Sequence, residues 1–162
     1  MNRTHARLPL ACAWLLTCLA LAALATEPSA QVQKSDSKVK ITAKADKPGP
    51  DGKQLVTLTL AIENGWHLYA NPVGNEDFAD NQTVVAAVPK SKHQVLKVDY
   101  PPGKVMKDKT VGDYKVYEDT VAIKVEVRRA KDSTEPLELN VKLQACNDKT
   151  CLLPATAKVK VE

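Results

Sequence analysis

Two cysteines near the C-terminus, Cys146 and Cys151, are the side chains of this sequence best suited to carry out chemistry. Four residues, 147–150, separate them, and their types (Asn, Asp, Lys, Thr) are compatible with a turn. A disulfide needs its two Cα atoms within about 7 Å of each other, which such a turn allows. The pair could therefore close a small loop at the end of a strand, as a redox centre or as a structural bridge.

As a structural bridge, the pair would contribute modest stability. A loop this short gives about 2 kcal/mol, less than half of what a long loop gives. A sandwich of this length has enough core to fold without the bridge, and an exposed bridge at a turn belongs to the more easily reduced class. A metal site is disfavoured because two thiolates need further ligands, and His67 and His93 lie far off without paired spacing. The spacing alone does not distinguish a redox centre from a structural bridge.

Residues 1–25 have the pattern of a secretory signal peptide, with an apolar run over 8–24 and small residues before a cleavage site after Ala25. The positive residues that open it are Arg3, His5 and Arg7. An uncleaved anchor is the alternative, although the apolar run is slightly short for a full span. A lipid attached to Cys18 is disfavoured because the apolar run continues past it. We therefore expect a periplasmic or secreted protein.

Composition narrows the possible functions further. The formal charge is +4, and removing the two arginines of the leader leaves +2. No basic block or basic-aromatic cluster suggests a nucleic-acid surface. No later apolar run is long enough to span a membrane, so we expect a soluble mature chain. With Cys12 and Cys18 removed in the leader, Cys146 and Cys151 remain as an even pair in an oxidising compartment.

Alternation of apolar and polar residues after residue 38 predicts an all-β fold. Residues 26–37 are polar and predict a flexible tether, and 38–162 predict a single domain. Roughly eight strands are expected, near 38–44, 55–62, 66–69, 84–88, 95–100, 121–127, 137–143 and 157–161. Turn residues separate them, and 71–82 and 104–114 are expected to be loops. The pattern is typical of an antiparallel β-sandwich or barrel.

The cysteine segment resembles a known family. It reads Gln144-x-Cys146, four residues, then Cys151-Leu152-x-Pro154. This is similar to the active-site segment of the N-terminal periplasmic domain of the thiol:disulfide interchange protein DsbD. Residues 65–69 are similar to that family's Gly-aromatic-x-Leu-Tyr strand, and residues 111–119 resemble its loop that enters a strand through a Tyr-x-Asp step. The similarity extends from about residue 38 to the C-terminus.

The resemblance implies an immunoglobulin-like antiparallel β-sandwich with the cysteine pair at its edge. It implies a protein thiol-disulfide oxidoreductase that needs no cofactor or metal. Its dithiol would take electrons from a membrane electron transporter and pass them to periplasmic thioredoxin-like proteins. Cys151 would form the mixed disulfide with the partner, and Cys146 would close the internal bridge. Because the chain printed here ends at Glu162, we expect the transporter and the thioredoxin-like partner to be separate proteins.

Residues near the pair also have expected roles. Leu152, Leu153 and Pro154 form an apolar shoulder for a partner, with core packing as the alternative for one leucine. The family's cap loop, which shields the disulfide, corresponds here to Asp108, Thr110, Val111 and Tyr114. Residues 108–112 lack the aromatic residue that the family carries there, and Val111 or Tyr114 could take its place. Asp108 could accept a proton. Some family members also have five residues between the cysteines rather than four.

Other roles remain open on the sequence. The chain could be a secreted β-sandwich binding or assembly module whose disulfide only pins a turn. A third possibility is Cu(I) binding through Met106 and the two cysteines. Trp66 and Tyr69 are expected in the sandwich core, and His67, which alternates with Trp66, at the surface.

Overall fold

Alternating apolar and polar residues form the strands of this structure, a computed structural model that describes residues 32–130, 133 and 135–161. In β2 (Lys53–Ile62) every second residue is buried, and the same period is found in β8 (Thr120–Arg128) and β9 (Glu138–Leu143). Successive side chains of a strand point to opposite faces, so each strand buries one face. The prediction of an all-β domain is confirmed. The predicted signal peptide and residues 26–31 of the predicted tether lie outside the described residues.

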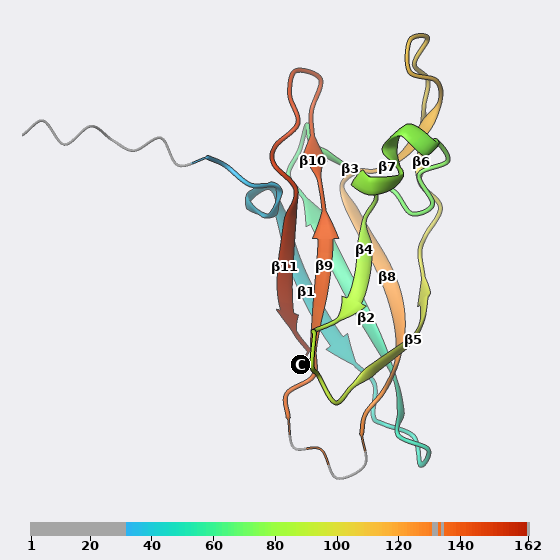
Figure 1. The fold of residues 1–162 in the computed structure, drawn as a ribbon, viewed down its shortest axis with the longest axis vertical. Helices are drawn as coiled ribbons and strands as arrows, with labels where there is room; N and C mark the ends of the chain where they lie inside the picture. The colour runs from blue at the N-terminus through green and yellow to red at the C-terminus, as the bar shows by residue number, and fades with distance from the viewer. Residues whose placement is uncertain (1–31, 131–132, 134, 162) are drawn as a thin grey trace, which may run out of the picture. The chain divides into compact units, whose positions relative to one another are not determined.

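Three antiparallel sheets make up the described part of the chain (Figure 1). Their strand orders are β1-β2-β8-β5, β11-β9-β4 and β10-β3-β7-β6. The strands of the first two sheets not yet given are β1 (Val39–Ala45), β5 (Gln94–Asp99), β4 (Val84–Ala87) and β11 (Ala155–Lys160). The third sheet is built from short strands, β3 (His67–Tyr69), β6 (Lys104–Met106), β7 (Tyr114–Tyr117) and β10 (Ala145–Cys146).

The core lies between the first two sheets. One cluster of buried side chains joins Leu58 and Val125 of the first sheet to Leu139 and Val141 of the second. Figure 1 shows β11-β9-β4 lying over β1-β2-β8-β5. Two antiparallel sheets that bury their inner faces against each other form a β-sandwich. The fold is thus the immunoglobulin-like antiparallel sandwich that the resemblance implied.

The third sheet carries the cysteine strand, β10, which follows β9 after the single residue Gln144. A buried tyrosine in β7, Tyr117, fastens this sheet to the loops around it. Its hydroxyl accepts a hydrogen bond from the Asn71 amide at 3.2 Å and lies 3.1 Å from the Pro101 carbonyl oxygen. The tyrosine thereby holds the end of β3 and the approach to β6 in place.

Two regions differ from the sequence prediction. Residues 104–114 were expected to be a polar loop, but β6 occupies the first three and β7 begins at the last. These strands are three and four residues long, and β6 buries no side chain, so no alternation marks it. The segment 71–82 contains a 3-10 helix, η2 (Glu76–Asn81), which begins after Asn75; the Asn75 side chain accepts a hydrogen bond from the Asp77 amide.

A second 3-10 helix, η1 (Ser35–Lys38), overlaps the end of the range 26–37 that was predicted as a tether. Its first residue, Ser35, is buried against the sandwich. These residues belong to the folded domain because a buried polar side chain with hydrogen-bond partners fixes the backbone that carries it. The ordered domain therefore begins several residues before Lys38. No helix among the described residues has the length and hydropathy that a membrane span requires.

Candidate functional site

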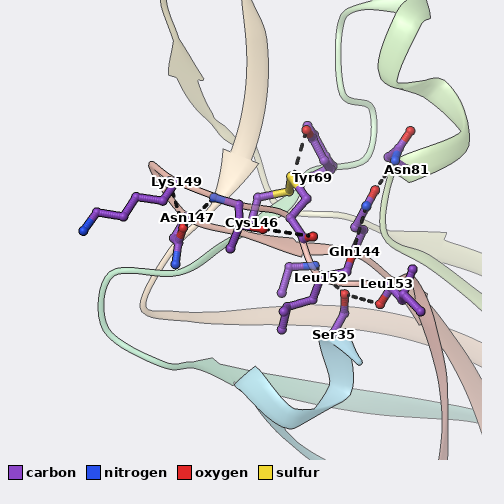
Figure 2. The surroundings of a disulfide bond; sticks show 12 residues. Ser35, Tyr69, Asn81, Gln144, Cys146, Asn147, Lys149, Leu152 and Leu153 are labelled. Carbon is purple, nitrogen blue, oxygen red and sulfur yellow. Dashed lines mark hydrogen bonds between the residues drawn. A yellow bond between two sulfur atoms is a disulfide. The ribbon is translucent and has the colours of Figure 1, made fainter. Parts of the chain in front are cut away.

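A tight hairpin that begins in β10 carries both cysteines (Figure 2). Cys146 and Cys151 face each other in an antiparallel bridge and form a disulfide, with their Cα atoms 4.0 Å apart. Asn147 shapes the turn between them: its side-chain oxygen accepts hydrogen bonds from the Lys149 and Thr150 amides, each at 2.9 Å. The four intervening residues thus form a turn, as their types predicted.

The base of the hairpin is held by polar contacts between its arms. The Leu152 amide donates to the Ala145 carbonyl at 2.9 Å. The Gln144 side-chain amide donates to the Leu152 carbonyl at 3.1 Å, and its oxygen accepts from the Asn81 side chain at the end of η2. The hairpin is therefore anchored both to itself and to the neighbouring loop.

The two halves of the disulfide differ sharply in exposure. Cys146 is 2 % exposed, whereas Cys151 is exposed to solvent. Cys146 packs in a small cluster separate from the main core, with Val73 and three aromatic rings. We call these rings, Tyr69, Phe78 and Tyr114, the aromatic cover. Cys151 is thus the half of the disulfide that faces solvent, whereas Cys146 is covered.

The rings of the aromatic cover pack closely on one another. Phe78 stacks on Tyr69 with ring centroids 5.1 Å apart, and Tyr114 lies 5.0 Å from Phe78. The Tyr69 hydroxyl lies 3.8 Å from the Cys146 sulfur. Because a disulfide sulfur carries no hydrogen, the hydroxyl is the donor in this contact. Burial, reinforced by Tyr114, raises the pKa of Tyr69, so its hydroxyl stays protonated near neutral pH.

Most of the aromatic cover was not predicted from the sequence. Tyr69 was assigned to the sandwich core, and Phe78 lies in a segment expected to be irregular. One signal was available: Phe78 is the only phenylalanine in the chain and stands among Asn, Asp and Gly residues. A lone large aromatic ring in a polar segment has little reason to be there unless it covers something.

Of the four predicted cap-loop residues, the structure places only one in the cluster around Cys146. Tyr114 belongs to the aromatic cover, while Asp108, Thr110 and Val111 lie in the loop between β6 and β7. Among the hydrogen bonds of the described residues, none joins these three to a cysteine. The loop is fastened to η2 instead, because the Asn75 side chain donates to the Val111 carbonyl at 2.8 Å.

Asp108 organises its own loop. Its carboxylate accepts hydrogen bonds from the Thr110 amide at 2.7 Å and the Val111 amide at 3.1 Å. These two bonds hold the pKa of Asp108 below its usual range. A carboxylate stabilised in its charged form is a weak proton acceptor, which disfavours the acid–base role considered for it.

The apolar shoulder beside the disulfide is partly open. Leu152 is half-buried, whereas Leu153 is 54 % exposed and Pro154 is exposed as well. The charged side chains of the turn lie away from this apolar shoulder. Lys149 extends away from the sulfur atoms in Figure 2, and Asp148 lines a pocket with His67. The surface at this point therefore combines an exposed cysteine, Cys151, with exposed apolar side chains.

His67 lies beside the disulfide strand rather than free on the surface. It pairs with Cys146 in the β3–β10 ladder and shares its pocket with Met106. Burial lowers the pKa of His67, the Glu118 and Asp148 carboxylates partly oppose this shift, and Lys104 adds to it. Within the described residues, no three His, Cys, Asp or Glu side chains are grouped so as to hold a metal ion.

The lowered pKa of His67 predicts a pH dependence of stability. The unfolded chain binds this proton near pH 6.5, above the folded protein. The contribution of neutral His67 to stability is therefore fully present above about pH 6.5. It falls as the pH drops below that value, until His67 of the folded protein is also protonated. His67→Gln should remove this loss of stability. The loss arises because unfolding takes up less than one additional proton at His67. Urea unfolding of both proteins at pH 7.5 and 5.5 tests it; equal losses in both would contradict it.

Several solved structures are similar to this chain. The reduced DsbD N-terminal domain of Neisseria meningitidis aligns with a TM-score of 0.49 and 19 % identity, over 79 % of this chain and 86 % of that one. A complex between the DsbD and PilB N-terminal domains of the same species aligns with a TM-score of 0.45 and 17 % sequence identity, over 74 % of this chain and 80 % of that one. The N-terminal periplasmic domain of ScsB from Proteus mirabilis aligns with a TM-score of 0.47 and 18 % sequence identity, over 74 % of this chain and 44 % of that one.

Sequence comparison gives a clearer assignment. No curated protein sequence matches this chain. The family model described as thiol:disulfide interchange protein DsbD, N-terminal, matches residues 29–162. That range contains the whole sandwich, the disulfide hairpin and the aromatic cover. The chain therefore belongs to the family of the N-terminal domain of thiol:disulfide interchange protein DsbD.

Proposed function

We propose that this protein is a periplasmic thiol-disulfide exchange domain. It would pass two electrons through Cys146 and Cys151, from a membrane electron transporter to thioredoxin-like partners. The observation that carries the proposal is the half-covered disulfide, with Cys151 exposed and Cys146 2 % exposed under the aromatic cover. A structural staple gains nothing from presenting one sulfur to solvent. An exchange centre needs one sulfur to be attacked and a second to leave.

In the first half of the cycle the domain is reduced. A thiolate of the transporter's dithiol attacks the Cys151 sulfur, which breaks the Cys146–Cys151 bond and forms a mixed disulfide. Cys146 leaves as a thiolate, and the Tyr69 hydroxyl, 3.8 Å from its sulfur, can donate a hydrogen bond to that charge. The transporter's second thiolate then attacks its own sulfur in the mixed disulfide. This releases Cys151 as a thiolate and leaves the transporter oxidised.

In the second half the domain reduces its partner. The Cys151 thiolate attacks the disulfide of a thioredoxin-like protein, forms a mixed disulfide and releases one partner thiolate. The Cys146 thiolate then attacks the Cys151 sulfur, restores the internal disulfide and releases the second partner thiolate. The partner gains two electrons, and solvent supplies protons to its thiolates.

Leu153 and Pro154 are the proposed docking surface for these partners, because they are exposed beside Cys151. An apolar contact there would bring the partner's sulfur to the accessible half of the disulfide. The transporter as electron donor and the thioredoxin-like acceptor follow from the family resemblance. The periplasmic location rests on the predicted signal peptide, which would be cleaved after Ala25.

The reduction potential of the disulfide tests the proposed function. The oxidised protein is equilibrated with glutathione or dithiothreitol buffers, and the reduced fraction is measured by thiol labelling. We expect a potential above about −300 mV, in the range of exchangeable disulfides. A lower value would place the bond among inert structural bridges and would favour a binding module with a structural disulfide.

A further inference from the structure

One buried serine connects both arms of the disulfide hairpin. Ser35 in η1 is 0 % exposed. Its hydroxyl donates to the Leu153 carbonyl at 2.7 Å and accepts from the Ala145 amide at 2.9 Å (Figure 2). Its own amide donates to the same Leu153 carbonyl at 3.0 Å. Ala145 directly precedes Cys146, and Leu153 stands two residues after Cys151. We call these three hydrogen bonds the serine clamp.

The serine clamp links the same two arms that the disulfide links. In the oxidised protein the covalent bond holds the arms together in any case. Once that bond is reduced, the arms are held by non-covalent contacts alone. Beyond the disulfide, the Asn147 amide donates to the Thr150 carbonyl at 2.9 Å. Before it lie the Leu152–Ala145 and Gln144–Leu152 bonds, the β9–β11 ladder and the serine clamp. Ser35 comes from outside the hairpin, more than 100 residues earlier in the chain, so it does not move with either arm.

We propose that Ser35 is a positioning residue that keeps Cys146 within reach of Cys151 while the disulfide is open. The inference rests on the proposed exchange function. During exchange, the Cys146 thiolate must attack the Cys151 sulfur of a mixed disulfide. The rate of such an internal attack depends on the effective concentration of one group at the other, which a rigid scaffold raises. The serine clamp therefore favours closure of the internal disulfide and rapid release of the partner.

Ser35→Ala removes the hydroxyl with little change in shape. The hydroxyl makes two of the three hydrogen bonds of the serine clamp, and losing one ordinary hydrogen bond corresponds to about fivefold. We therefore expect the effective concentration of the two thiols, measured by equilibrium with glutathione, to fall by between about fivefold and about 25-fold. The lifetime of the mixed disulfide with a thioredoxin-like partner should lengthen by a similar factor. Ser37→Ala is the matched control, because the exposed Ser37 hydroxyl donates to the carbonyl of Lys34, the residue before η1, and makes no hydrogen bond to the hairpin among the described residues.

A purely structural role for Ser35 gives a different result. In that case Ser35→Ala would destabilise the oxidised and reduced forms equally in urea and leave the glutathione equilibrium at the wild-type value. That outcome would overturn the positioning role. Failure of the wild-type protein to exchange with glutathione at all would instead overturn the proposed function, so the two failures are distinguishable.

A measurement on the wild-type protein avoids any folding defect of the variant. Amide hydrogen exchange reports whether the Ala145 N–H, which donates to the Ser35 hydroxyl, stays protected after reduction. The serine clamp predicts protection of this amide in both redox states. Rapid exchange in the reduced protein alone would show that the clamp opens with the disulfide, and would contradict the proposal.

Discussion

Cys146→Ala is expected to stop turnover and to leave the protein joined to its partner through Cys151. The exposed Cys151 thiolate can still attack a partner disulfide, but no second thiolate remains to release the mixed disulfide. Loss of that step should lower turnover on the order of 10³-fold or more. Incubation with an oxidised thioredoxin-like protein, followed by non-reducing gel electrophoresis and mass spectrometry, would reveal the trapped complex.

Cys151→Ala is the matched control for this experiment. It leaves Cys146, which is 2 % exposed beneath the aromatic cover, as the only cysteine of the pair. A buried thiol cannot approach a protein disulfide in line, so little complex should form. Equal trapping by the two variants, or trapping by Cys151→Ala alone, would show that the roles of the two cysteines are not those proposed.

Phe78→Ala is expected to uncover Cys146. Phe78 packs against both tyrosines of the aromatic cover, with centroids 5.1 and 5.0 Å away. Its removal should cost about 2 kcal/mol of stability through lost burial and ring contacts. In a Cys151→Ala background, the rate of Cys146 alkylation by iodoacetamide should rise by roughly tenfold, the equivalent of about 1.4 kcal/mol less protection.

Val111→Ala distinguishes the aromatic cover from the predicted cap loop. Val111 is exposed, and its loop is fastened to Asn75 rather than to the disulfide. We expect this variant to alkylate at the rate of its parent. If Val111→Ala accelerated the reaction as much as Phe78→Ala, the loop between β6 and β7 would be the shield, and Phe78 would have no special role.

Family resemblance and local pattern carried much of the functional prediction. The types of residues 147–150 favoured a turn between the cysteines, and the structure contains that turn. The alternation in β2, β8 and β9 predicted which side chains face the core, because a strand exposes each face every second residue. These signals extend over ten residues or fewer, so they can be read without knowing where the rest of the chain lies.

The surroundings of the disulfide could not be predicted in the same way. Tyr69 is 77 residues from Cys146 in the sequence, and Ser35 is 110 residues from Ala145. No local period connects such pairs, because only the packing of whole strands brings them together. The short strands β6 and β7 were missed for a related reason: they are held by pairing with neighbours rather than by burial of alternate side chains.

The amino-acid sequence by itself determined the longer β-strands, the turn between the cysteines and the presence of a cysteine pair, because each depends on neighbouring residues. Only the tertiary structure decided that Cys146 is buried while Cys151 is exposed. It also decided that Phe78 packs in the cluster around Cys146 and that Ser35 hydrogen-bonds to the hairpin. Exposure is a property of the packed molecule, since a side chain is shielded by whichever segments the fold lays over it.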